Sequence, residues 1–144
     1  MSKIDLIIFG ATGDLSARKL FPALFHLDVS GLLTSDLRIA AVARQDQDSS
    51  AFQSELRAKM AGYMRQEIDD DAWQKFSSRI VYLAADFSQP QAFEQLRGWL
   101  DDSRVSLFYL ATPPSLFAPI CAQLSSDGCL TGPRRIVQIG RAHV

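Results

Sequence analysis

Short apolar runs alternate along this chain with longer segments in which apolar residues recur every three or four positions. The short runs have the content expected of strands buried on both faces, and the longer segments have the period of helices with one apolar side. Strands that alternate with helices are typical of βαβ units on a parallel sheet. The pattern therefore predicts the α/β class, with a doubly wound parallel sheet.

The expected elements follow one another without an internal repeat or a long linker. Strands are predicted at residues 4–9, 38–43, 80–83, 105–110 and 135–137, and helices at residues 18–30, 48–64, 69–76, 90–100 and 116–124. Pro22 has no N–H to donate, so we expect it to kink the first helix, which Gly31 ends. Asp48 or Ser49 can cap the second helix, and Pro90 suits the first position of the fourth.

The last expected strand is short, and no helix follows it within the 144 residues. We therefore expect a sheet that is incomplete at its C-terminus. Residues 139–144 are also the translation of ATC-GGA-AGA-GCA-CAC-GTC, a run found in a common sequencing-adapter oligonucleotide. The expected organisation is one partial domain at residues 1–138 and a non-native tail at residues 139–144, which carries no weight in fold reasoning.

Charge and hydropathy exclude several broad classes. The formal net charge of −1 argues against general nucleic-acid binding, which needs a basic surface. No apolar run approaches the roughly 18 residues that a membrane helix requires. Met1-Ser2-Lys3 leads straight into strand-like residues, without the pattern of a signal peptide. We expect a cytoplasmic protein with neither nucleic acid nor membrane as partner.

A glycine-rich turn, Phe9-Gly10-Ala11-Thr12-Gly13-Asp14-Leu15, joins the first strand to the first helix. Such a turn lets the backbone approach phosphate groups, and unpaired N–H groups at the helix start point at them. The position predicts the first βα unit of a Rossmann-like nucleotide-binding domain. Because Ser16 or Ala17 stands where a third glycine would lie, a plain tight turn capped by Thr12 or Asp14 is the alternative.

Arg44 follows the second strand, where an NAD-preferring site usually places an acidic residue for the ribose 2′-hydroxyl. A guanidinium can instead pair with a 2′-phosphate through forked, charge-assisted hydrogen bonds. Arg44 therefore favours NADP, with an ordinary solvated arginine as the alternative. Asp86 after the third strand could lie near the adenine or ribose, or could cap a helix. Ala111 after the fourth could line the nicotinamide side, or simply begin a turn.

These segments together resemble the amino-terminal signature of the glucose-6-phosphate 1-dehydrogenase family. The resemblance spans almost all of residues 4–137 and rests on the glycine loop, Arg18-Lys19-Leu20-Phe21-Pro22-Ala23-Leu24, the end of the second strand, and Phe108-Tyr109-Leu110-Ala111-Thr112-Pro113-Pro114-Ser115. It implies an NADP site whose 2′-phosphate ligand is Arg44, with further contacts near Asp86 and Ala111. By position, the family's coenzyme loop falls on Gly10, Ala11, Thr12, Gly13, Asp14, Leu15, Ser16 and Ala17.

The resemblance also implies what the parent enzyme does: it oxidises glucose 6-phosphate to 6-phosphogluconolactone at the entry to the pentose phosphate pathway. The family's Glu-Lys-Pro motif would follow Val137, where this chain has Gln138-Ile139-Gly140. The family's catalytic histidine and its substrate-binding segment lie further downstream. We therefore expect no catalytic residue in this chain, no turnover, and a parent that is a homo-oligomer through a further domain.

Two other functions compete with this interpretation. One is a non-catalytic NADP-binding regulator or sensor built on the same Gly-Ala-Thr-Gly loop. The other is a reductase or epimerase, which needs a Tyr-x-x-x-Lys pair. Tyr63, Tyr82 and Tyr109 are followed four residues later by Glu67, Asp86 and Pro113, so that pair is missing.

Overall fold

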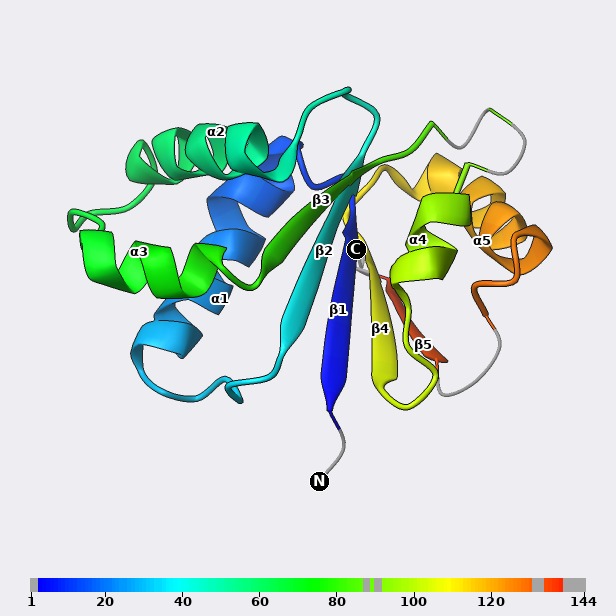
Figure 1. Ribbon diagram of the computed structural model, residues 1–144. Helices are drawn as coiled ribbons and strands as arrows, with labels where there is room; N and C mark the ends of the chain where they lie inside the picture. Colours follow the sequence, from blue (N-terminus) through cyan, green and yellow to red (C-terminus); the bar gives the residue numbers. More distant parts are fainter. Residues whose placement is uncertain (1–2, 87–88, 90–91, 131–133, 139–144) are drawn as a thin grey trace.

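The structure is a computed structural model, and it describes residues 3–86, 89, 92–130 and 134–138, the last five as backbone only. Within these residues the sheet has five parallel strands in the order β3-β2-β1-β4-β5 (Figure 1). The strands are β1 (Ile4–Phe9), β2 (Arg38–Ala43), β3 (Ile80–Ala84), β4 (Val105–Leu110) and β5 (Arg134–Gln138). This order is that of a doubly wound Rossmann-like sheet. The predicted fold class is confirmed, and each predicted strand agrees to within one residue at either end.

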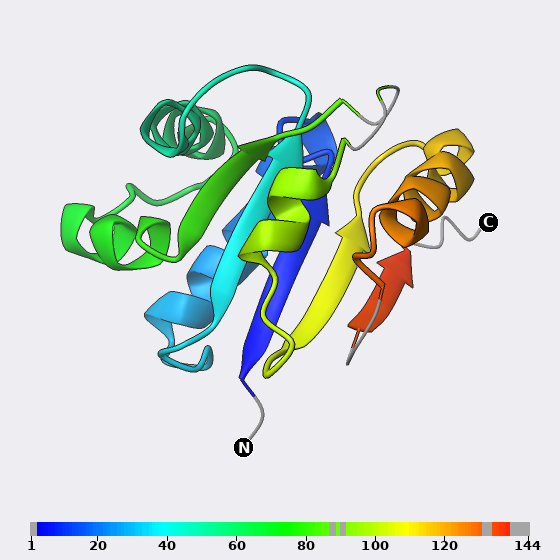
Figure 2. The same cartoon turned by 45° about the vertical axis from the view of Figure 1, so that its right-hand side comes forward.

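Helices cover both faces of the sheet, as Figures 1 and 2 show. On one face lie α1 (Phe21–Val29), α2 (Ser49–Ala61) and α3 (Asp70–Ser77), and on the other lie α4 (Glu94–Trp99) and α5 (Phe117–Ser126). Successive residues of β1 divide between two cores, with Ile8 facing the first group of helices and Ile7 and Phe9 facing the second. That division explains why β1 is apolar from Leu6 to Phe9.

The first helix accommodates Pro22 by changing its hydrogen-bond pattern. Ser16–Leu20 forms a π-helical turn, η1, in which the N–H of Phe21 donates to the carbonyl of Ser16. Pro22 then falls in the first turn of α1, where its missing N–H is tolerated. The predicted kink is therefore a π turn ahead of the proline. At the other end Gly31 adopts φ +74°, and Leu32 donates to the carbonyl of Leu27, as in a Schellman motif.

The remaining helix boundaries were predicted with mixed success. Asp48 caps α2 by accepting from the N–H of Ala51, and Asp69 caps α3 in the same way. The extension of the second helix to Met64 was wrong, because α2 ends at Ala61. The fourth helix, α4, begins at Glu94 and not at Pro90, which lies outside the described residues. A 3-10 turn, η2 (Pro114–Leu116), precedes α5.

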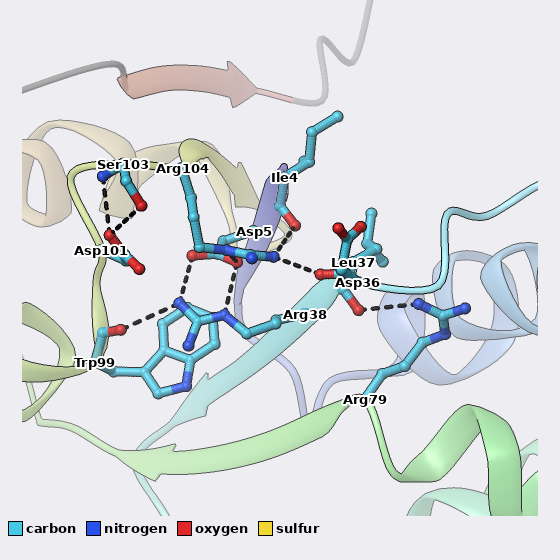
Figure 3. A network of polar contacts seen from close by, with 10 residues as sticks. All are labelled: Ile4, Asp5, Asp36, Leu37, Arg38, Arg79, Trp99, Asp101, Ser103 and Arg104. Carbon is cyan, nitrogen blue, oxygen red and sulfur yellow. Dashed lines mark hydrogen bonds and ion pairs between the residues drawn. The ribbon is translucent and has the colours of Figure 1, made fainter. Parts of the chain in front are cut away.

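A buried carboxylate joins three segments at the edge of the sheet where the strands begin (Figure 3). Asp5 on β1 is fully buried and accepts from Arg38 on β2 at 2.8 and 2.5 Å, and from Arg104, just before β4, at 2.6 Å. The guanidinium of Arg38 also lies 4.0 Å from the centroid of the Trp99 ring. Hydrogen bonding to Asp5 raises the pKa of Arg38 above its usual value. Arg104 donates further to the carbonyls of Ile4 and Asp36.

We predict that Asp5→Asn lowers the free energy of unfolding by about 3 kcal/mol, because it leaves two arginines without their counter-charge in a mostly buried site. Glu55→Gln is the control, since its ion pair with Lys59 is half exposed and should contribute less than about 0.5 kcal/mol. Urea denaturation of the two variants measures both values. Equal losses in both would show that the buried network contributes no more than a surface pair.

Candidate functional site

A cavity of about 530 Å³ opens at the edge of the sheet where the strands end. It lies between the ends of β1, β2 and β3 and the segment that follows β4. This is the switch point of a doubly wound sheet, because the connection after β1 leads to β2 on one side and the connection after β4 leads to β5 on the other. Its described lining consists of Phe9, Gly10, Thr12, Val42, Ala43, Arg44, Gln45, Ala85, Asp86, Phe93, Thr112, Leu116 and Ile120.

Gly10 is required where it stands for two physical reasons. Its φ of +77° lies in the left-handed region that L side chains rarely adopt, and a Cβ there would lie 2.6 Å from the carbonyl oxygen of Ala111. The N–H groups of Gly10 and Ala11 both donate to the carbonyl of Val42. The loop after β1 therefore passes close to the segments that follow β2 and β4, with no side chain between them.

The loop then turns directly into a helix. The N–H of Gly13 donates to the carbonyl of Gly10, and helical backbone begins at Asp14. Ser16 is fully buried, and its hydroxyl also donates to the carbonyl of Gly10, at 3.0 Å. The first N–H groups of a helix have no partner within it, and such groups bind phosphate oxygens. Ala11 and Ala17 are buried beneath the turn, so the loop depends on small residues there.

Side-chain hydrogen bonds tie this loop to the segment after β2. The hydroxyl of Thr12 bonds with Oε1 of Gln45 at 3.0 Å, and the hydroxyl of Tyr82 donates to the Gln45 carbonyl at 2.6 Å. Burial raises the pKa of the Tyr82 hydroxyl, and it also raises that of Tyr109. Tyr82 therefore stays a neutral donor, and it fixes the position of the residue next to Arg44.

The structure gathers only some of the predicted site residues at the cavity. Gly10, Thr12, Arg44 and Asp86 line it, and Ala111 contributes the backbone that Gly10 approaches. The other predicted residues do not line it: Ala11, Ser16 and Ala17 are buried under the loop, while Gly13, Asp14 and Leu15 lie on its exposed side. Their contribution to binding rests on the backbone and stays a prediction.

Several lining residues were not predicted from the sequence. Gln45 is next to Arg44, and Thr112 lies inside the Ala-Thr-Pro-Pro segment, so both were near recognised motifs. Phe93, Leu116 and Ile120 carry apolar side chains at helical spacing, a pattern that indicates core packing and gives no sign of a cavity. No sequence signal distinguishes them.

The donor groups at this edge fit an anionic dinucleotide. Arg44 is exposed, and no ion pair within the described part of the chain engages its guanidinium. The hydroxyl oxygen of Thr112 is buried and unpartnered among those same residues, which is uncommon for a polar atom next to a cavity. Together with the side-chain-free cradle at Gly10, these groups could hold the phosphates and ribose of a nucleotide coenzyme.

Two other kinds of site are not seen in the described residues. No group of three or more potential metal ligands occurs among them, and none of their helices is long and apolar enough to cross a membrane. Two of the three acidic residues at 69–71 have structural roles, because Asp69 caps α3 and Asp70 pairs with Arg57 at 2.5 Å.

Fold and cavity together define a nucleotide-binding domain of the dehydrogenase type. Comparison with known proteins identifies its family. The family model for the glucose-6-phosphate dehydrogenase NAD-binding domain matches residues 7–138. The chain belongs to the glucose-6-phosphate dehydrogenase family.

Individual relatives agree with this assignment. Glucose-6-phosphate 1-dehydrogenase of Mycolicibacterium smegmatis is 35% identical over 140 residues, which cover 92% of this chain and 28% of the relative. The crystal structure of the Mycobacterium avium enzyme superposes with a TM-score of 0.85 and 29% identity, covering 95% of this chain and 29% of that one. A glucose-6-phosphate dehydrogenase in complex with glucose 6-phosphate superposes with a TM-score of 0.78 and 28% identity. The match covers 95% of this chain and 30% of that one. The chain thus spans less than a third of the length of these relatives.

We predict that Gly10→Ala lowers the free energy of unfolding by about 2–4 kcal/mol, because it combines left-handed strain with a clash against Ala111. Gly31→Ala is the matched control: its φ is +74°, but no atom lies within 4 Å of the added Cβ. It should lose only the strain, about 1 kcal/mol. Chemical denaturation measures the free energy of unfolding of both variants. Equal losses would contradict the prediction, because they would mean that the clash between the loops after β1 and β4 has no energetic effect.

Proposed function

We propose that this chain is the coenzyme-binding domain of an NADP-dependent glucose-6-phosphate dehydrogenase. The whole enzyme oxidises glucose 6-phosphate to 6-phosphogluconolactone. The observation that carries the proposal is Arg44, which follows β2 and lines a cavity at the switch point of a Rossmann-like sheet. No ion pair with another described residue engages its guanidinium. NADP, when bound, supplies the acceptor for the hydride that leaves the sugar.

Each part of the site has a proposed task. The backbone of the loop from Gly10 to Ala17 holds the bisphosphate, with its small residues allowing close approach. Arg44 binds the 2′-phosphate through forked hydrogen bonds. We assign Asp86, which lines the cavity, to the adenine or ribose, and the backbone at Ala111 to the nicotinamide side. No residue of this chain is proposed as the catalytic base. His26 is exposed on α1 and does not line the cavity.

The boundaries and partners are proposals of the same kind. We place the coenzyme domain at residues 1–138 and treat residues 139–144 as a non-native tail. Sequencing the gene beyond the codon for Val137 tests that assignment. We propose, by analogy with the family, that the whole enzyme acts on glucose 6-phosphate, is a homo-oligomer and is cytoplasmic. The matched relatives are dehydrogenases, so the regulator or sensor hypothesis has no comparable support.

We predict that Arg44→Ala weakens NADP binding about 10- to 100-fold and changes NAD binding less than about twofold. The loss of charge-assisted hydrogen bonds to a phosphate, about 1.5–3 kcal/mol, gives this range. Isothermal titration of the purified chain with each coenzyme measures both affinities. Arg65→Ala is the control, because Arg65 is exposed between α2 and α3 and does not line the cavity. An equal effect of Arg44→Ala on both coenzymes would contradict the assignment of this residue.

A further inference from the structure

A second cation, Lys59, reaches the glycine loop from outside the nucleotide-binding motifs. Lys59 lies in the last turn of α2, some 15 positions beyond Arg44 in the chain. Its Nζ donates to the carbonyl of Thr12 at 3.2 Å and pairs with Glu55 Oε1 at 3.2 Å. An ammonium has three donors, and contacts with the described residues use two of them. The side chain is 42% exposed, so the remaining donor has access to a ligand.

Thr12 links this ammonium to the end of the cavity where Arg44 lies. Its carbonyl accepts from Lys59, and its hydroxyl bonds with the side chain of Gln45, the residue after Arg44. Thr12, Arg44 and Gln45 all line the cavity. Lys59 therefore contacts the backbone of a residue that lines the same cavity as Arg44. Exposed charges interact appreciably when they lie within one Debye length of each other, about 8–10 Å at ordinary ionic strength.

Carboxylates near the end of β2 would oppose the binding of a phosphate, and a second cation would offset their charge. Glu55 and Asp46 lie near enough to the Tyr82 hydroxyl for their negative charges to add to the effect of burial in raising its pKa. That hydroxyl sits 2.6 Å from the carbonyl of Gln45. A doubly charged phosphate near Arg44 would be repelled by each of these carboxylates that lies within a Debye length of it. Lys59 neutralises one of them directly, through its ion pair with Glu55.

We infer that Lys59 is a specificity-determining residue, whose ammonium supplements Arg44 in selecting a coenzyme with a 2′-phosphate. The inference rests on the proposed function, because it concerns the 2′-phosphate end of the same NADP site. Lys59 also has a structural role open to it, since a cation in the last turn of a helix and a Glu–Lys pair four residues apart both stabilise the helix. That role would affect NAD and NADP equally.

Isothermal titration of the purified chain and its variants with NADP and with NAD separates these roles. Lys59→Met should weaken NADP binding about two- to fivefold, the effect of an exposed charge pair, and leave NAD binding unchanged. Lys59→Arg keeps the charge and should bind NADP within a factor of two of the original chain. Glu55→Gln removes the opposing carboxylate and should strengthen NADP binding. Lys75→Met on α3 is the matched control, since it makes the same charge change beside Asp28, away from the cavity lining.

Raising the salt concentration should shrink the difference between Lys59→Met and the original chain, because screening weakens the interaction of exposed charges. The inference is overturned if Lys59→Met binds NADP as tightly as the original chain, or if it weakens NADP and NAD by the same factor. Failure of the proposed function looks different. In that case the original chain binds NADP no more tightly than NAD, or binds neither, and Arg44→Ala has no selective effect.

Discussion

The close contact between the loop after β1 and the loop after β4 is the constraint on which the site depends. At Gly10 the two backbones approach so closely that a single methyl group would fall 2.6 Å from the Ala111 carbonyl. The same residue needs a left-handed conformation, so only glycine meets both demands. This contact closes the base of the cavity at the switch point. It also sets the direction in which the chain enters the helix at Asp14, and hence where the first helical N–H groups point.

Charge is distributed unequally between the two edges of the sheet. Where the strands begin, Asp5 is fully paired with Arg38 and Arg104, and Arg79 pairs with Asp28 at 2.9 Å in an equally buried position. Those arginines are held by carboxylates and carbonyls of the protein itself. Where the strands end, Arg44 has no such partner among the described residues, and its charge is available to a ligand. One edge thus uses arginine for stability, and at the other edge we propose that Arg44 serves binding.

The sequence was sufficient to predict the strands and the fold class, because β1, β2 and β4 are short, mostly apolar runs that alternate with segments of helical period. It also located Gly10 and Arg44, whose chemistry depends on their position relative to a strand end. The π turn before Pro22 was not predictable in detail, since a proline requires only that one hydrogen bond be absent. Thr112 and Lys59 were missed for a different reason. The burial of the Thr112 hydroxyl and the contact of Lys59 with Thr12 both depend on segments distant in sequence, and neither residue type is unusual where it occurs.

Lys59 also shows why the net charge of −1 gives little information about anion binding. Near the end of β2 the chain carries Asp46, Asp48 and Glu55 alongside Arg44, so that a count of local charges would argue against a phosphate. Asp48, however, is engaged as the cap of α2, and Glu55 is paired with Lys59. With these two carboxylates engaged, Arg44 and Asp86 are the charged residues in the described lining of the cavity. The electrostatic character of the site therefore follows from which charges are already paired, and that information is present only in the folded chain.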